Sequence, residues 1–130
     1  MSEQFLGSSP ILPVADVRET ARFYKKKLGF ETVGLWQDPN YGVVRRGQTV
    51  IEFGTGRKEF AGSGVCFIHV ENADKVHDEW AARDIEFVGD LSDRDYGSRD
   101  FRIRDNNGNM LIVGHPLHNQ AELLRKGNIA

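Results

Sequence analysis

The side chains in this sequence that could ligate a metal ion or act as a base are few and lie far apart. Glu52 interrupts the apolar run "VIEF", and a buried carboxylate is costly unless it is paired or reached by water. Cys66 is the single cysteine, and the histidines are His69, His77, His115 and His118. A divalent cation needs about three protein ligands, so these residues could form a metal site only if the fold brings several of them together.

Other arrangements that typically support catalysis or phosphate binding are missing from the sequence. Ser9, Ser63 and Ser98 lack an evident neighbouring base, so none of them resembles an activated nucleophile. Cys66 alternates with Phe67 along a strand and is expected to point to the opposite face. The segment "GTGR" lacks the Lys-Ser or Lys-Thr pair of a P-loop. We therefore predict no catalytic residue.

The composition indicates a soluble single domain and argues against several classes of partner. The chain has 130 residues, of which 39% are hydrophobic, and this is enough for one compact core. Its 17 basic and 19 acidic residues give a net charge of −2, whereas a nucleic-acid binder would carry a concentrated basic face. No apolar run is long enough to span a membrane, and one cysteine fits a reducing compartment. We expect a cytoplasmic protein with no nucleic-acid or membrane partner.

The elements that must position these residues occur twice, because the second half of the chain repeats the first. "ILPVADVRETARFYKKKLGFETVG" in the first half corresponds to "CFIHVENADKVHDEWAARDIEFVGD" in the second. The residues that correspond at one constant offset are Val14 and Val70, Asp16 and Asn72, and Tyr24 and Trp80. Such a run of matches indicates an internal duplication.

Each half predicts a strand, a helix and three further strands, written βαβββ. The first helix begins after Asp16, which can form a capping box with Glu19, and it ends at Gly29. Ala73, Val76 and Trp80 mark the buried stripe of the second helix. The strands are expected near 11–14, 30–36, 41–46 and 49–53 in the first half and near 65–70, 85–88, 98–104 and 110–114 in the second.

Together these elements predict an α+β fold in one domain, residues 1–130, built from two βαβββ modules. The first module spans about 9–56 and the second about 64–115. Residues 57–64, rich in glycine and charge, are predicted to link them. A turn at 106–109 joins the last two strands, because Asn-Gly tolerates positive φ. In the tail, 116–130, "HNQAELLRKGNIA" predicts a short helix that ends at Gly127.

The motifs "PVADV", "FYKKKLGF", "VIEFG" and "YGSRDFRIRDNNGN", in this order, resemble the vicinal oxygen chelate superfamily. This superfamily includes glyoxalases, bleomycin-resistance proteins and dioxygenases, and the resemblance covers residues 9 to about 115. The segments "HDEW" and "YGSRDFRIRD" are most similar to bleomycin-resistance proteins. The resemblance implies mixed, curved sheets that form a cleft, and a homodimer with grooves at its interface. It leaves open whether the N-terminal strands are exchanged between the two copies.

The resemblance also implies where a metal site would be. Metal-dependent members use four side chains that face the cleft, and here only Glu52 matches a ligand type. Ser9 (or a close neighbour), Val65 and Ile112 stand at the other three positions. His69 shares strand parity with Val65, so with Glu52 it supplies at most two ligands. We predict no metal and no cofactor, with a metal-dependent lyase, dioxygenase or thiol transferase that uses substitute ligands as the alternative.

The cleft residues that remain predict a site for a flat organic ligand. In bleomycin-resistance proteins, aromatic side chains stack on the ligand, and Tyr41, Phe67 and Tyr96 resemble that pattern. The expected ligand-binding residues are Tyr41, Glu52, Phe67, His69, Tyr96 and Ile112. Glu52 would favour a cationic or donor-rich ligand.

Each of these residues also has a purely structural interpretation. Phe67 can fill the core, His69 can be a hydrogen-bonded structural histidine, and Tyr96 can close a turn. Glu52 can belong to a structural ion pair. The nearby arginines Arg99, Arg102 and Arg104 are expected to pair at the surface with Asp95, Asp100 and Asp105.

The sequence therefore predicts a non-catalytic protein of the bleomycin-resistance type, which sequesters an aromatic, cationic or donor-rich compound in a groove at a homodimer interface. The net charge of −2 offers little steering for a strongly cationic drug, so the natural ligand can be another aromatic compound. Besides the metal-dependent enzyme, a third hypothesis is an interaction module that uses the fold for dimerisation.

Overall fold

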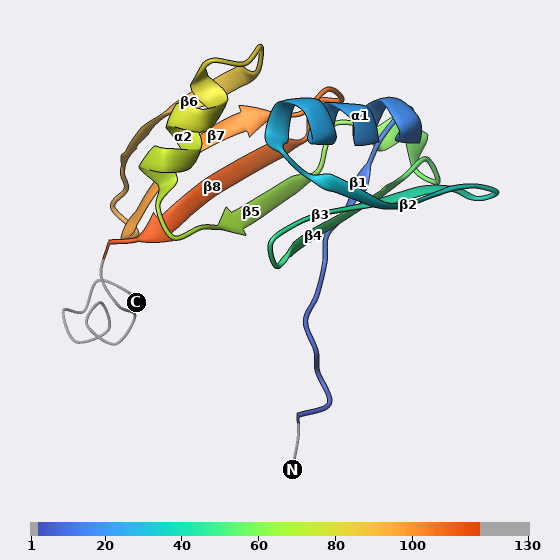
Figure 1. Ribbon diagram of the computed structural model, residues 1–130, viewed down its shortest axis with the longest axis horizontal. Coiled ribbons are helices and arrows are strands. Elements are labelled where there is room, and N and C mark those ends of the chain that lie inside the picture. Colours follow the sequence, from blue (N-terminus) through green and yellow to red (C-terminus); the bar gives the residue numbers. More distant parts are fainter. Residues whose placement is uncertain (1–2, 118–130) are drawn as a thin grey trace.

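Two four-stranded sheets lie side by side in the computed structural model, and each sheet carries one helix on one of its faces (Figure 1). The structure describes residues 3–117. The first module contains β1 (Ile11–Pro13), α1 (Val17–Leu28), β2 (Glu31–Gln37), β3 (Asn40–Arg46) and β4 (Thr49–Gly54). The second contains β5 (Val65–His69), α2 (Ala73–Ala81), β6 (Glu86–Asp93), β7 (Ser98–Arg104) and β8 (Met110–Pro116). Among the described residues, no helix has the length and apolar content needed to cross a membrane.

The two sheets have the same topology, which confirms the predicted pair of βαβββ units. Their strand orders are β1-β4-β3-β2 and β5-β8-β7-β6. In each sheet the first strand pairs in parallel with the last, and the other pairs are antiparallel. Both sheets are therefore mixed, as expected from the α+β fold.

The first helix begins and ends where the sequence predicts. The Asp16 side chain accepts a hydrogen bond from the backbone N–H of Glu19 at 2.9 Å, and Gly29 ends α1 with a φ of 79°. The Asn72 side chain caps α2 in the same way, through the backbone N–H of Lys75. Both helices bury one apolar face against their own sheet.

Two parts of the described chain differ from the prediction. Strand β6 runs to Asp93, well beyond the expected end near Val88, because Ser92 and Asp93 pair with β7. The predicted linker contains a short 3₁₀ helix, η1 (Lys58–Phe60). The predicted C-terminal helix lies outside the described residues.

The partners predicted for Arg99, Arg102 and Arg104, which were Asp95, Asp100 and Asp105, are wrong. Arg99 instead pairs with Asp74 of α2 and with Asp93, while Arg104 lies 3.6 Å from Glu86. Alternate residues of a strand point to opposite faces, so Arg99 faces the helix and adjacent Asp100 does not.

The β7–β8 turn, Asp105–Asn109, holds its own shape through one buried carboxylate. Asp105 is only 6% exposed. Its Oδ1 accepts hydrogen bonds from the backbone N–H groups of Asn107 (2.8 Å) and Asn109 (3.0 Å). Its Oδ2 accepts hydrogen bonds from the Asn109 side chain (3.2 Å) and from the hydroxyl of Tyr24 in α1 (2.8 Å). The turn of the second module therefore binds the helix of the first.

Asparagine side chains extend the same connection between the modules. Asn107 accepts a hydrogen bond from the backbone N–H of Ala15 and donates one to the hydroxyl of Thr20. Asn109 donates to the Pro13 carbonyl and accepts from the backbone N–H of Gly64. These bonds explain why Asn109 can be fully buried, because they satisfy polar groups that would otherwise be costly to bury.

On the opposite side of the molecule, an arginine–glutamate pair joins the modules. Arg46 at the end of β3 donates to both carboxylate oxygens of Glu79 in α2, at 2.7 and 2.8 Å, and also to the Leu28 carbonyl. The hydrogen bond from Arg46 holds the pKa of Glu79 below its usual range. This two-pronged contact is partly exposed, so it contributes less than a buried network would.

We predict that the Tyr24–Asp105 contact is important for stability. Tyr24→Phe removes the hydroxyl and leaves the buried carboxylate with one donor fewer, so the free energy of unfolding should fall by about 1–3 kcal/mol. Urea denaturation followed by tryptophan fluorescence measures this change. Tyr41→Phe is the matched control, because it also removes a phenol–carboxylate bond, but at a partly exposed site. An equal loss of stability in both variants would contradict a special role for Asp105.

Candidate ligand-binding pocket

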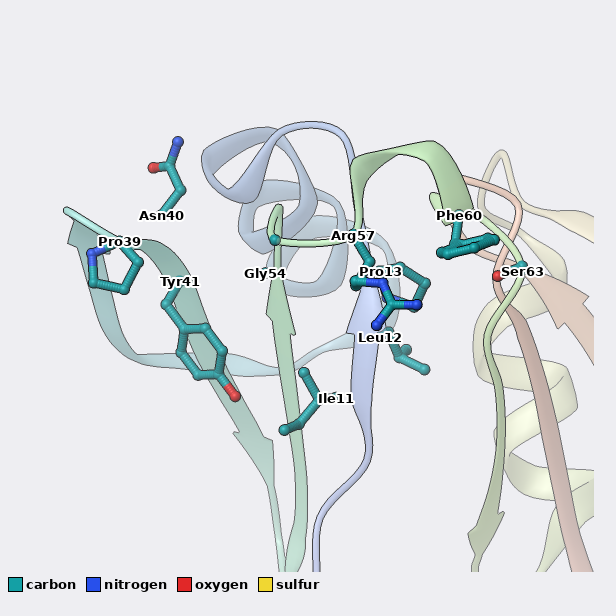
Figure 2. A pocket seen from close by; sticks show the side chains of 11 residues that line it. Ile11, Leu12, Pro13, Pro39, Asn40, Tyr41, Gly54, Arg57, Phe60 and Ser63 are labelled. Atoms are coloured by element: carbon teal, nitrogen blue, oxygen red, sulfur yellow. The ribbon is translucent and has the colours of Figure 1, made fainter.

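A pocket of about 460 Å³ lies at one end of the first sheet. Figure 2 shows Tyr41 and Pro39 on one side of this pocket, Arg57 and Phe60 on the other, and Ile11 between them. The pocket is lined by Ile11, Leu12, Pro13, Pro39, Asn40, Tyr41, Gly54, Gly56, Arg57, Phe60 and Ser63. Most of this wall is apolar, and two aromatic rings form part of it.

Strand register places the Tyr41 ring in the pocket wall. Tyr41 on β3 stands opposite Gly54 on β4, and a Cβ atom at position 54 would lie 3.0 Å from the Tyr41 ring. Glycine at this position therefore lets the ring lie close to the neighbouring strand. The indole of Trp36 on β2 lies on the other side, with its ring centroid 6.5 Å from that of Tyr41.

The Glu52 carboxylate lies on the same face of the first sheet as Tyr41 and accepts a hydrogen bond from its hydroxyl. The Tyr41 hydroxyl donates a hydrogen bond to Glu52 Oε1 at 2.8 Å, and the Ser9 hydroxyl donates one to Oε2. Both carboxylate oxygens are therefore engaged, and Glu52 itself does not line the pocket. The hydrogen bonds from Tyr41 and Ser9 therefore support a structural role for Glu52 more than a role in direct contact with a ligand in this pocket.

The environment of Tyr41 keeps its hydroxyl protonated. Burial, the hydrogen bond to Glu52 and the negative charge of that carboxylate together raise the pKa of Tyr41 to about 12. Tyr41 is therefore a neutral hydrogen-bond donor at physiological pH, and it cannot serve as a general base there.

The second sheet holds three other predicted site residues together. The rings of Phe67 and His69 on β5 lie 4.7 Å apart, tilted by 33°. Ile112 on β8 stands beside Phe67 in the strand register. His69 also lines a separate pocket of about 370 Å³ between the modules. In the described part of the chain, no hydrogen bond or ring contact joins this group to Tyr41 and Glu52, so their shared role in ligand binding stays a prediction.

Tyr96 belongs to a third group, which encloses a buried aspartate. Its hydroxyl donates to Asp100 Oδ2 at 2.6 Å, and Arg94 donates to Oδ1 at 2.8 Å. Burial alone would raise the pKa of Asp100, but the hydrogen bonds from Tyr96 and Arg94 outweigh it and hold this pKa below its usual range. Asp100 was expected at the surface, and its fully buried position is a correction to the sequence analysis.

Arg57 and Phe60 are pocket residues that the sequence analysis assigned to a linker. The guanidinium carbon of Arg57 lies 5.0 Å from the centroid of the Phe60 ring, in a cation–π arrangement. The sequence does show an aromatic residue three positions after an arginine. These two residues line the pocket only because the linker passes over the end of the first sheet, and the sequence pattern does not indicate that path.

The residues around Glu52 do not fit the metal site that the fold family would imply. Its oxygens contact two hydroxyl groups, those of Ser9 and Tyr41, and no histidine or second carboxylate. Across residues 3–117, no group of three or more His, Cys, Asp and Glu side chains is placed to hold a metal ion. The predicted absence of a metal stays a prediction.

Comparison with known families and structures gives consistent matches. The family model described as "Glyoxalase/Bleomycin resistance protein/Dioxygenase superfamily" matches residues 8–113. A bleomycin-binding protein from Streptomyces verticillus, solved with copper(II)-bleomycin, is 27% identical, with a TM-score of 0.68 over 86% of this chain and 97% of that chain. The comparison with curated proteins gives no match.

Two further solved structures are similar. A virulence protein from Salmonella typhimurium is 26% identical, with a TM-score of 0.67 over 89% of this chain and 98% of that chain. The antibiotic-binding protein TnmS3 from Streptomyces sp. CB03234 is 16% identical, with a TM-score of 0.73 over 88% of this chain and 99% of that chain. At this identity the last similarity is one of fold alone.

The Tyr41–Glu52 contact predicts a specific change in tyrosine titration. Glu52→Gln removes the negative charge that disfavours tyrosinate, so the pKa of Tyr41 should fall from about 12 towards 10. Absorbance at 295 nm against pH measures it, and the difference from Tyr41→Phe isolates the signal of Tyr41. Because this pKa is raised in the folded protein, its contribution to stability is complete below about pH 10 and is lost as the pH rises towards 12.

Glu59→Gln is the control for this titration, because Glu59 is an exposed carboxylate that makes no contact with Tyr41. A titration curve that is the same in Glu52→Gln as in the unaltered protein would show that Glu52 does not set the pKa of Tyr41.

Proposed function

The chain belongs to the Glyoxalase/Bleomycin resistance protein/Dioxygenase superfamily, and from this starting point we propose that it is a non-catalytic binding protein for a small aromatic compound. The single observation that carries the proposal is the pocket with the rings of Tyr41 and Phe60 in its wall. The similarity to a bleomycin-binding protein, at 27% identity, supports binding as the activity of this scaffold.

The size and chemistry of the pocket support a flat organic ligand. Its volume, about 460 Å³, falls within the range of roughly 300–1,000 Å³ that is usual for small-molecule sites. Tyr41 and Phe60 line the same space from different segments and can each offer a face or an edge to an aromatic guest. Each aromatic contact of this kind adds about 0.5–1.5 kcal/mol beyond the burial of apolar area.

The polar groups near the pocket support binding more than turnover. The raised pKa of Tyr41 leaves it protonated, and Glu52 is occupied by two hydroxyl donors. Sequestration of a ligand requires affinity alone, so a pocket without a general base or a nucleophile is sufficient for it.

We further infer that the protein acts as a cytoplasmic homodimer. The N-terminal segment extends away from the body of the molecule in Figure 1, and its Phe5 and Leu6 side chains are 86% and 97% exposed. Adjacent apolar side chains with this exposure favour burial against another surface, and a second copy of the chain supplies one. The free thiol of Cys66 is in keeping with a reducing compartment.

Binding is tested by isothermal titration calorimetry with two probes, metal-free bleomycin and neutral 2-naphthalenemethanol. We expect Tyr41→Ala to weaken binding of the naphthalene probe about two- to tenfold, because one stacking face is lost. Phe67→Ala is the control, since it removes a ring on the second sheet that does not line this pocket. Weaker binding in Phe67→Ala with no change in Tyr41→Ala would place the ligand on the second sheet, against the proposal.

The dimer is tested by sedimentation velocity over a range of protein concentrations. Leu6→Asp should raise the fraction of monomer, because a charge would have to be buried at the interface. Leu6→Met keeps the apolar area and should leave the distribution unchanged. A protein that is monomeric at all concentrations would contradict the homodimer.

A further inference from the structure

We propose that Arg57 makes the pocket selective for aromatic compounds that carry a negative charge, such as aromatic carboxylates. This inference rests on the proposed function, because it names the ligand class of the same pocket. The proposed ligand is anionic, whereas the sequence led us to expect a cationic one. The reason for the change is the identity of the charged side chain that lines the pocket.

Arg57 is the one charged residue among the eleven described residues that line the pocket. The nearby carboxylate of Glu52 lies outside this lining, and hydroxyl donors bind both of its oxygens. A guest in the pocket would therefore touch a guanidinium group directly, whereas the Glu52 carboxylate keeps its negative charge and lies beyond the Tyr41 hydroxyl that it binds. A cationic guest would be placed next to a like charge, which is unfavourable.

The guanidinium of Arg57 is positioned by its neighbours but has donors to spare. It lies over the Phe60 ring at 5.0 Å, and it is directly beside the space that the ring lines. The ion pair that the structure gives it is a loose one, 4.0 Å to Glu59, and both side chains are largely exposed. Planar guanidinium groups bind carboxylates through two parallel N–H bonds, so these donors can receive an acidic group.

The geometry thus assigns two parts to the ligand. An aromatic body would contact Tyr41 and Phe60, and an acidic substituent would point towards Arg57 at the rim (Figure 2). Because Arg57 is 74% exposed, solvent and salt weaken its attraction for an anion. The selectivity is therefore expected to be modest and sensitive to ionic strength.

The test compares three ligands of matched shape: 2-naphthoate, 2-naphthalenemethanol and 2-naphthylmethylammonium. Calorimetry at pH 7 and low ionic strength should give 2-naphthoate about three- to tenfold higher affinity than the neutral alcohol, and the ammonium compound the lowest. Arg57→Gln should bring 2-naphthoate to within about twofold of the alcohol, because the alcohol does not use the charge. High salt should reduce the preference in the unaltered protein.

Lys58→Gln is the matched control, because it removes an adjacent positive charge that does not line this pocket. It should leave the preference for 2-naphthoate in place. The inference is overturned if the ammonium compound binds as tightly as 2-naphthoate, or if Arg57→Gln keeps the full preference. Failure of all three compounds to bind at millimolar concentration would instead overturn the proposed aromatic-binding function, and the ligand class with it.

Discussion

The rest of the structure depends on one buried carboxylate, that of Asp105, which lies between the two modules. Burial of an unpaired charge would cost several kcal/mol, so this residue is stable there only with its full set of donors. Three of them come from its own turn, and the fourth is the hydroxyl of Tyr24 in the other module. The donors to Asp105 are therefore complete only when the turn and the first helix are together. This contact couples two modules whose sheets, within residues 3–117, share no hydrogen-bonded strand pair.

The same turn also fixes the segment that closes the pocket. The backbone N–H of Gly62 donates to the Pro13 carbonyl, and a Cβ atom at position 62 would lie 2.2 Å from the Asn107 carbonyl oxygen. Glycine is required at this close approach, and its φ of 88° is one that other residues rarely adopt. The linker is thus held between the first strand and the turn, and it carries Phe60 and Arg57 over the end of the first sheet.

Internal duplication has produced two modules with the same scaffold and different chemistry. Tyr24 finds an acceptor in the long Asp105–Asn109 turn, whereas the corresponding Trp80 lies near the short Gly47–Gln48 turn and a pocket between the modules. On the sheets, the first module keeps an apolar pocket with a hydroxyl held by Glu52, and the second encloses Asp100 with Arg94 and Tyr96. Among the pocket residues described, this fold, which hosts many activities, offers aromatic ring faces and one cationic side chain, and these suit recognition of a guest by shape and charge.

The sequence by itself determined the elements and their order, because these follow from local rules. Alternating apolar residues gave the strands, and Asp16 and Gly29 marked the ends of the first helix through capping geometry that acts over a few residues. The internal repeat gave the two modules. Tyr41, which the repeat and the family resemblance suggested as a ligand-binding residue, lines the pocket, and its role in binding stays a prediction.

Only the tertiary structure decided which polar groups meet. Asp105 and Tyr24 are far apart in the chain, as are Glu52 and Ser9, and strand alternation fixes the face of a side chain but not its partner across the molecule. For that reason the sequence pattern predicted arginine partners at the surface for Asp100 and Asp105, which are buried, and it placed Arg57 and Phe60 in a linker without a role in the pocket. The positions of these residues depend on how the two modules pack, and packing is set by buried surface and hydrogen bonds summed over both.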